Sequence, residues 1–263
     1  MNNIVIRNIL SPIWLIFTGL FVYSPIAIML LFSFNNSETY SSWNGFTSIW
    51  YKQLFTSTEM ITALLSSLLV AVTSTFLAVT LSLFLVVANR WWSPWWLIRM
   101  FFINISIPEI FLAVAVLNIF VFLKISTGYL SLVVGHTLLG IGYAIPLLHA
   151  AILDVDKALI DSSFDLGATH MQTFRFVLFP ILKPVVIAAS FLVFTLSLDD
   201  FFINFFCSGV EFSTASTYVY TTIRSYVDPS LNALSSTLFF LSLILVLIVP
   251  ASKSISKVLR DED

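Results

Sequence analysis

The chain has 263 residues, of which 59% are hydrophobic and only 10% are charged, against about 45–50% apolar and about 25% charged in ordinary soluble domains. With a mean hydropathy of +0.98, this composition excludes a water-soluble globule. The formal net charge of -2 leaves no basic excess for a nucleic-acid backbone. The single cysteine, Cys207, excludes an intrachain disulfide framework and a Cys-rich metal site.

Apolar runs of about 20 residues are long enough to cross a bilayer as helices. The sequence has six such runs, and they lack the alternating hydrophobicity of barrel strands. We therefore expect an all-α polytopic membrane protein with one integral-membrane domain over residues 1–263. The expected spans are residues 10–34, 61–88, 100–123, 129–153, 184–207 and 233–250.

The first apolar run follows Arg7 and so imitates a secretory signal peptide. It is longer than the about 7 to 15 residues of a signal-peptide core, and no small-x-small cleavage site follows it near Ser33–Ser37. We interpret it as an uncleaved first helix.

Basic residues predict the orientation of the chain, because cytoplasmic loops carry an excess of Lys and Arg. A cytoplasmic N-terminus and C-terminus would place nine bases on the inner side and three on the outer side. The inner set is Arg7, Arg90, Arg99, Lys157, Arg175, Lys183, Lys253, Lys257 and Arg260, and the outer set is Lys52, Lys124 and Arg224.

The fourth span carries two histidines, His136 and His149, which are thirteen residues apart. That spacing is too wide for a metal site on one helix face, so we expect these side chains to pack or to form hydrogen bonds. No metal site is expected in this chain.

The inner loop over residues 154–183 has apolar residues at helical spacing on both sides of Gly167. Glycine there permits a tight left-handed turn, and Pro180 is expected to stop the second helix. The pattern predicts a short helix, a turn and a second helix. From the residues alone, an amphipathic loop lying on the membrane surface is an equal alternative.

One stretch of this loop resembles a known sequence signature. Asp161-Ser162-Ser163, followed by Gly167-Ala168 and then by Leu178-Phe179-Pro180, resembles the Glu-Ala-Ala loop of binding-protein-dependent ABC transporter permeases. In that family the short helix docks onto a cytoplasmic ATPase, and the resemblance implies the same role here. The chain departs from the pattern, since Asp161 replaces glutamate and Ser162 and Ser163 replace the alanines.

Further segments resemble the permease subunits of spermidine/putrescine importers. These are Gly45–Thr47, Ser106–Glu109, Leu196–Asp200 and Asp228–Ala233. The resemblance implies a type I importer in the bacterial inner membrane, with a second, distinct permease, two copies of a cytoplasmic ATPase and a soluble periplasmic binding protein. The sequence has no G-x-x-x-x-G-K-[ST] phosphate loop, so ATP and Mg are expected on the ATPase and no cofactor on this chain.

Three carboxylates, Glu109, Asp199 and Asp200, lie within the apolar runs, while no Lys or Arg does. A charge at a helix centre costs on the order of 2.5–3.5 kcal/mol, so such residues usually face a cavity or a partner. Along straight helices Glu109 would lie roughly 14 Å from the cytoplasmic end, and the two aspartates roughly 22–24 Å. We expect the three to line a cation pathway. Two alternatives stay open: the aspartates cap the end of the fifth span, or Glu109 pairs with a base of another subunit.

Polyamines fit an acidic pathway, and aromatic faces such as those of Trp50 and Tyr51 can add cation–π attraction. Trp50 could equally be an interface anchor.

A polar stripe on the fifth span is formed by Ser190, Ser197, Asp200 and Asn204. Asp200 is therefore the better candidate to face the pathway, and Asp199 would lie at the flank of the stripe. No catalytic residue is expected.

Three other functions are weighed against a polyamine importer. The first is an ABC importer of a metal cation, an iron complex or an amino acid. The second is an ATP-independent transporter or channel. The third is an intramembrane aspartyl protease, which adjacent aspartates disfavour because the two carboxyls of a dyad must face each other.

Overall fold

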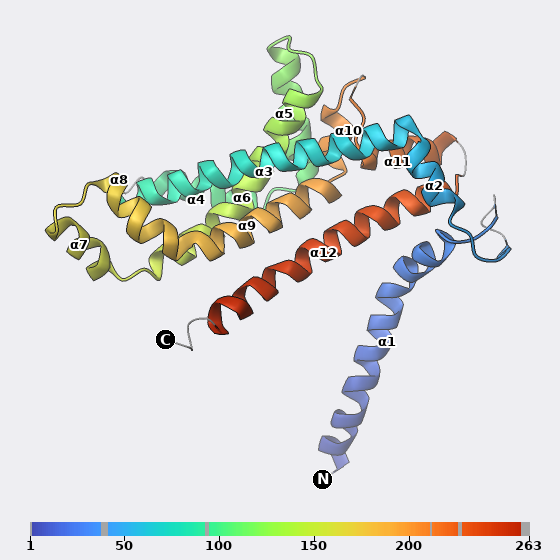
Figure 1. Ribbon diagram of the computed structural model, residues 1–263, viewed down its shortest axis with the longest axis horizontal. Helices are drawn as coiled ribbons and strands as arrows, with labels where there is room; N and C mark the ends of the chain where they lie inside the picture. The colour runs from blue at the N-terminus through green and yellow to red at the C-terminus, as the bar shows by residue number, and fades with distance from the viewer. Residues whose placement is uncertain (1, 38–41, 93–94, 211, 226–227, 259–263) are drawn as a thin grey trace. The chain divides into compact units, whose positions relative to one another are not determined.

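The computed structural model describes residues 2–37, 42–92, 95–210, 212–225 and 228–258. Apart from one isolated bridge between Asn35 and Phe46, its regular elements are helices (Figure 1). They are α1 (Asn2–Phe32), α2 (Ile49–Thr56), α3 (Thr58–Trp92), α4 (Trp95–Asn104), α5 (Glu109–Phe122), α6 (Tyr129–Leu153), α7 (Lys157–Asp165), α8 (His170–Thr173), the π-helix η1 (Phe174–Leu178), α9 (Phe179–Asp199), α10 (Phe202–Cys207), α11 (Ala215–Ser225) and α12 (Ser230–Val258).

The chain divides into two compact units. The first comprises residues 1–61 and 221–240, and the second comprises residues 62–220 and 241–263. The Glu109, Asp199 and Asp200 carboxylates and the inner loop all belong to the second unit, whereas Trp50 and Tyr51 belong to the first. The single domain expected from the sequence stays a prediction.

Four of the expected spans are confirmed as helices long and apolar enough to cross a membrane. They are Trp14–Phe32, Thr58–Trp91, Tyr129–Leu153 and His170–Asp199. The last expected span lies in α12, whose apolar stretch within the described residues, Ser230–Ile244, is shorter. The all-α membrane fold is therefore confirmed, and the number of six spans stays a prediction.

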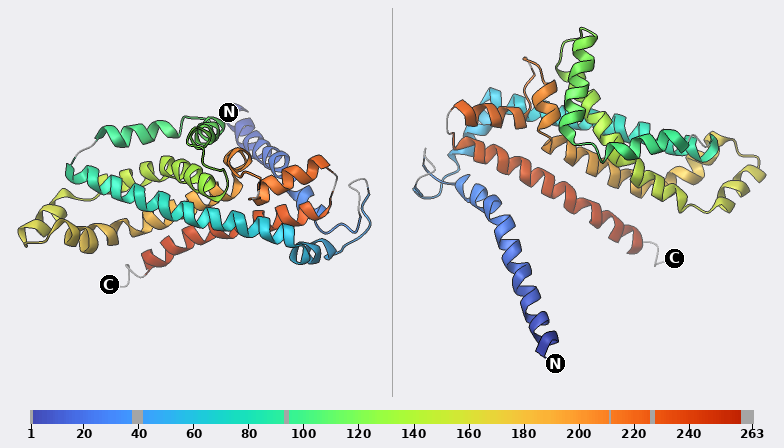
Figure 2. Two further views of the ribbon diagram at one scale, coloured as in Figure 1. Left: turned by 90° about the horizontal axis from the view of Figure 1, so that it is seen from above. Right: turned by 180° about the vertical axis from the view of Figure 1, so that it is seen from behind.

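The expectation of one straight third span is wrong. This run forms two helices, α4 and α5, and the chain direction bends by 113° between them across residues 105–108 (Figure 2). Pro108 disfavours helical geometry at the residue before it. The side chain of Asn104 fixes the end of α4 by donating from Nδ2 to the carbonyl of Leu138 over 2.8 Å. Glu109 is consequently the first residue of a helix, so its depth cannot be counted along one straight span.

The boundary expected between the inner loop and the fifth span is also wrong. Helical structure continues from His170 through η1 to Asp199, so Pro180 does not end a helix and no helix begins at residue 184. The π-helix lies one turn before Pro180, where the missing proline N–H disturbs the regular bonding. At the other end the run breaks after Asp199, and α10 is a separate short helix.

Close helix packing in the second unit depends on small residues of α6. Helices α6 and α9 run alongside each other (Figures 1 and 2). A Cβ atom added to Gly140 of α6 would lie 2.6 Å from Val193 of α9 and 2.8 Å from Ala78 of α3. Glycine at this position therefore lets three helices approach one another.

Gly140→Val should lower the thermal stability of the purified protein, because its branched side chain overpacks this junction at a cost of about 1–3 kcal/mol. Gly19→Val in α1 is the matched control, since nothing lies within 4 Å of a Cβ atom at that glycine. Thermal unfolding in detergent checks both variants. Equal melting temperatures for the two would contradict the packing described for α3, α6 and α9.

Candidate functional site

Asp200 lies in the break between α9 and α10 and is only 5% exposed. Its Oδ2 atom accepts hydrogen bonds from the main-chain N–H groups of Ile203, at 2.8 Å, and Asn204, at 3.3 Å. Its Oδ1 atom is buried without a hydrogen-bond partner among the described residues. Asp200 thus caps a helix, as one alternative allowed, but it caps the start of α10 within the expected fifth span rather than the end of that span, and it does so through one carboxylate oxygen.

Glu109 lies beside Asp200. It is half-buried at the start of α5, which packs against α10, and its carboxyl group interacts electrostatically with that of Asp200. The N-terminus of a helix carries a partial positive charge, which favours a carboxylate at this position. Two of the three carboxylates expected to act together therefore lie together, whereas Asp199 is exposed.

No group of three or more His, Cys, Asp or Glu side chains could hold a metal ion within the described part of the chain. The Glu109 and Asp200 carboxyls form a pair of oxygen acceptors without a third such ligand. An organic cation with several N–H donors suits a pair of this kind better than a metal ion does.

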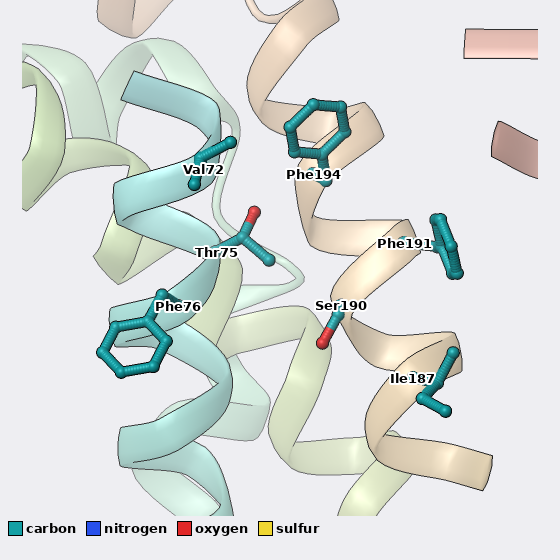
Figure 3. Close-up of a pocket in the computed structure, with 7 residues that line it drawn as sticks. All are labelled: Val72, Thr75, Phe76, Ile187, Ser190, Phe191 and Phe194. Carbon is teal, nitrogen blue, oxygen red and sulfur yellow. The ribbon is translucent and has the colours of Figure 1, made fainter. Parts of the chain in front are cut away.

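The expected polar stripe is divided by the end of α9: Ser190 and Ser197 lie on the side of α9 that faces α3, whereas Asp200 and Asn204 lie beyond that end. Ser197 is buried, and its Oγ atom lies 3.3 Å from that of Ser74 in α3. Ser190 lines a cavity of about 380 Å³ between the same two helices (Figure 3). Figure 3 shows Thr75 of α3 and three phenylalanine rings around this cavity, so its walls are largely apolar.

Trp50 and Tyr51 lie in α2 and are half-buried. The indole Nε1 of Trp50 donates to the carbonyl of Asn35 over 2.7 Å, and the Tyr51 hydroxyl lies 2.8 Å from Ser33 Oγ. Their polar atoms thus stabilise the connection between α1 and α2, and a cation–π role for their ring faces stays a prediction.

The helix, turn and helix expected in the inner loop are confirmed. Asp156 caps α7 by accepting from the N–H of Ala158, and Thr169 caps α8 in a reciprocal pair with Gln172. Gly167 lies between the two helices with φ +83°, a backbone conformation that glycine adopts without strain. Leu166, before it, is 89% exposed, which leaves an apolar side chain uncovered at the turn.

The serine substitutions in this loop have separate structural consequences. Asp161 and Ser162 are exposed, and Ala168 is half-buried. Ser163 is buried: its Oγ atom donates to the carbonyl of Ile160 and lies 2.8 Å from Thr173 Oγ1. The serine that replaces alanine at position 163 therefore links α7 directly to α8 through a hydroxyl contact, which an alanine could not make.

His170 connects the α7–α8 hairpin, residues 157–173, to the end of α3. Its ring centroid lies 4.9 Å from that of Trp91 and 5.0 Å from that of Phe164 in α7. A cavity of about 370 Å³ lies beside it, with Arg90, Lys157 and Asp161 among its lining residues. Ring packing and the Ser163–Thr173 contact together hold α7, α8 and α3 in one arrangement.

Sequence reasoning did not identify Asn204 as the residue that organises the break. His136, expected to pack or to form a hydrogen bond, does so with Asn204: the two side chains are 3.2 Å apart and both are buried. The position of Asn204 on the polar stripe was one signal of its importance. Its hydrogen-bond partners could not be predicted, because His136 lies on a helix that is distant in the sequence.

Thr173→Val should loosen the α7–α8 hairpin, because it keeps the buried volume and removes the hydroxyl that contacts Ser163. We expect amide hydrogen exchange in residues 157–173 to accelerate about tenfold, as the loss of about one net hydrogen bond implies. Ser162→Ala is the control, since its exposed hydroxyl bonds only within α7. Unchanged exchange in the Thr173 variant would contradict the role assigned to the contact.

Comparison with known proteins identifies the family. Residues 78–257 match the family described as "Binding-protein-dependent transport system inner membrane component". The spermidine/putrescine transport system permease protein PotC of Haemophilus influenzae is 30% identical over 231 residues, which cover 87% of this chain and 90% of that protein. The putrescine transport system permease protein PotI of Escherichia coli is 28% identical over 247 residues, which cover 90% of this chain and 88% of that protein.

Solved structures with the same fold are chains of ABC transporters. A chain of a bacterial ABC transporter involved in the import of alginate aligns over 97% of both chains, with a TM-score of 0.67 and 18% identity. A chain of the MetNI methionine ABC transporter aligns over 74% of this chain and 96% of its own length, with a TM-score of 0.60 and 20% identity. The chain therefore belongs to the family of inner membrane components of binding-protein-dependent transport systems, and it is a transport subunit rather than an enzyme.

Proposed function

We propose that this chain forms half of the translocation pathway of an ATP-driven importer of polyamines. The observation that carries the proposal is the Glu109–Asp200 pair, two neighbouring carboxyls at breaks in two apolar runs. The names of its relatives, permease proteins for spermidine and putrescine, support the same substrate class.

A primary ammonium group matches the acceptors that this pair offers. It carries three N–H donors and no acceptor, so one group can donate to both carboxyls at once. Oδ2 of Asp200 caps α10, so Oδ1 is the oxygen that remains for a substrate, and it is buried in this conformation. A cation would therefore reach it when the surrounding helices move apart, which is what a pathway open to one side at a time requires. The exposed Asp199 could contact a second amine of the same polyamine.

The family implies the partners with which the chain would act. We propose a heterodimer with a second permease, two copies of a cytoplasmic ATPase and a soluble periplasmic binding protein, with both termini of this chain in the cytoplasm. ATP and Mg would bind the ATPase, and this chain would bind no cofactor.

The hairpin of α7 and α8 is the proposed contact with the ATPase. Asp161 and Ser162 are exposed for docking, Gly167 and Ala168 form the turn, and Ser163 holds the two helices together. The exposed Leu166 supports this assignment, because a large apolar side chain is best covered by a partner. ATP binding would move the hairpin and open the pathway outward, and hydrolysis would reopen the inner side.

The acidic pair also favours a cation over other cargoes of such importers. A pathway lined by carboxyls repels an anionic complex, and an amino acid offers only one ammonium group. Competition between polyamines, metal cations and amino acids for the cognate binding protein distinguishes the polyamine importer from the same machine with another substrate. Uptake that persists without ATP would indicate a transporter or channel of another class.

Asp200→Asn and Glu109→Gln should each lower polyamine uptake by about tenfold or more, because each removes a charge that pairs with an ammonium group. The assay is uptake of labelled spermidine and putrescine into proteoliposomes that hold the complete importer. Glu59→Gln, a carboxylate exposed in the first turn of α3, is the matched control and should transport normally. Normal uptake by both Asp200→Asn and Glu109→Gln would overturn the proposed site.

A further inference from the structure

Three polar side chains from three helices form a hydrogen-bonded group next to Asp200. Asn204 belongs to α10, His136 to α6 and Ser216 to α11. Asn204 is 2% exposed and His136 is 1% exposed, so both side chains are cut off from solvent. A buried polar group costs free energy unless it is paired, so this group of residues demands a structural or a functional explanation.

The hydrogen bonds of Asn204 fix the orientation of its amide group. Nδ2 lies 2.6 Å from the main-chain carbonyl oxygen of Asp200 and 3.1 Å from Ser216 Oγ. The carbonyl oxygen can only accept, so the amide nitrogen must point to it. Oδ1 therefore faces His136, and Nε2 of His136 carries the hydrogen that it donates over 3.2 Å.

These contacts hold Asp200 at both its main chain and its side chain. Its carbonyl oxygen accepts from Asn204 Nδ2 and, over 3.2 Å, from Ser216 Oγ. Its Oδ2 atom accepts the main-chain N–H of the same Asn204. The Asn204 side chain thus fixes the backbone at the break, and the main-chain N–H groups of Ile203 and Asn204 fix one of the two carboxylate oxygens, which leaves Oδ1 in a single direction.

We propose that Asn204, itself held by His136 and Ser216, is a positioning residue that aligns the Asp200 carboxylate with Glu109 for one ammonium group of the substrate. This inference rests on the proposed function, because it assigns to Asn204 an effect that acts through Asp200. It makes the polar network part of substrate recognition as well as of folding. Loss of the network should leave the Asp200 carboxyl present but misaligned.

A double-mutant cycle separates this role from a purely structural one, because residues that act through one another are not additive. The assay is spermidine uptake by the complete reconstituted importer, together with ATP hydrolysis by the same vesicles. Asn204→Ala alone should lower uptake about tenfold, and in the Asp200→Asn background it should lower uptake no further. Asn118→Ala in α5 is the matched control, since that exposed amide bonds only to the carbonyl of Val114.

Two milder variants keep the test valid if Asn204→Ala does not fold. Ser216→Ala removes one of the donors to the Asp200 carbonyl and should lower uptake about threefold, and His136→Gln retains an N–H donor and should preserve more uptake than His136→Ala. Size-exclusion elution and melting temperature of each purified complex report folding separately.

The outcomes distinguish the two proposals. If Asp200→Asn and Glu109→Gln both transport normally, the proposed function fails at this site. If Asp200→Asn is impaired while folded Asn204 and Ser216 variants transport normally, the positioning role is overturned and the proposed function stands. Additive losses in the double variant would likewise overturn the positioning role, because they would show that Asn204 acts independently of Asp200.

Discussion

Hydrogen bonding in an apolar surrounding is the constraint on which the second unit of this chain depends. Main-chain groups released at a helix break have no water in a bilayer core to bind, so side chains must replace it. Asp200 and Asn204 do this between α9 and α10, where Oδ2 of Asp200 accepts two main-chain N–H groups of α10 and Nδ2 of Asn204 donates to the carbonyl of Asp200. The break between α9 and α10 and the polar side chains beside it are therefore physically linked, and the carboxyls of Glu109 and Asp200 lie together because α5 packs against α10.

A continuous helical segment connects the α7–α8 hairpin to this region. From His170 to Asp199 it contains 30 residues, which corresponds to roughly 45 Å at 1.5 Å per residue. The Ser163–Thr173 contact and the packing of His170 join α7 to its beginning, and the Asp200 break follows its end. In the proposed importer, a movement imposed on α7 would reach Asp200 along one helix instead of through a chain of loops. The π-helix after Thr173 is the irregular turn along that path.

Hydropathy was sufficient to predict most of the membrane helices, since α6 begins and ends where the apolar run does, at Tyr129 and Leu153. The Gly167 turn was predictable because few other residues adopt its backbone conformation. The breaks at residues 105–108 and at Asp200 were missed, because an apolar run has the same composition whether its helix is straight or bent. Pro180 was misinterpreted as a helix end, because the sequence around it does not show that the π-helix before it accommodates the proline.

The sequence was sufficient to predict which carboxylates belong to the candidate site, but not which side chains they contact. Carboxylates in apolar runs mark Glu109, Asp199 and Asp200 from composition alone. Which two of them meet depends on the packing of α5 against α10, and the support from His136 and Ser216 depends on α6 and α11. Local periodicity carries no information about such long-range pairs.

A structure of the assembled importer with a polyamine bound in the membrane tests the central claim most directly. The account predicts an amine nitrogen within hydrogen-bond distance of both Asp200 Oδ1 and the Glu109 carboxyl, with Asn204 still bonded to the Asp200 carbonyl. A polyamine bound elsewhere, with Glu109 or Asp200 paired to a base of the second permease, would contradict it.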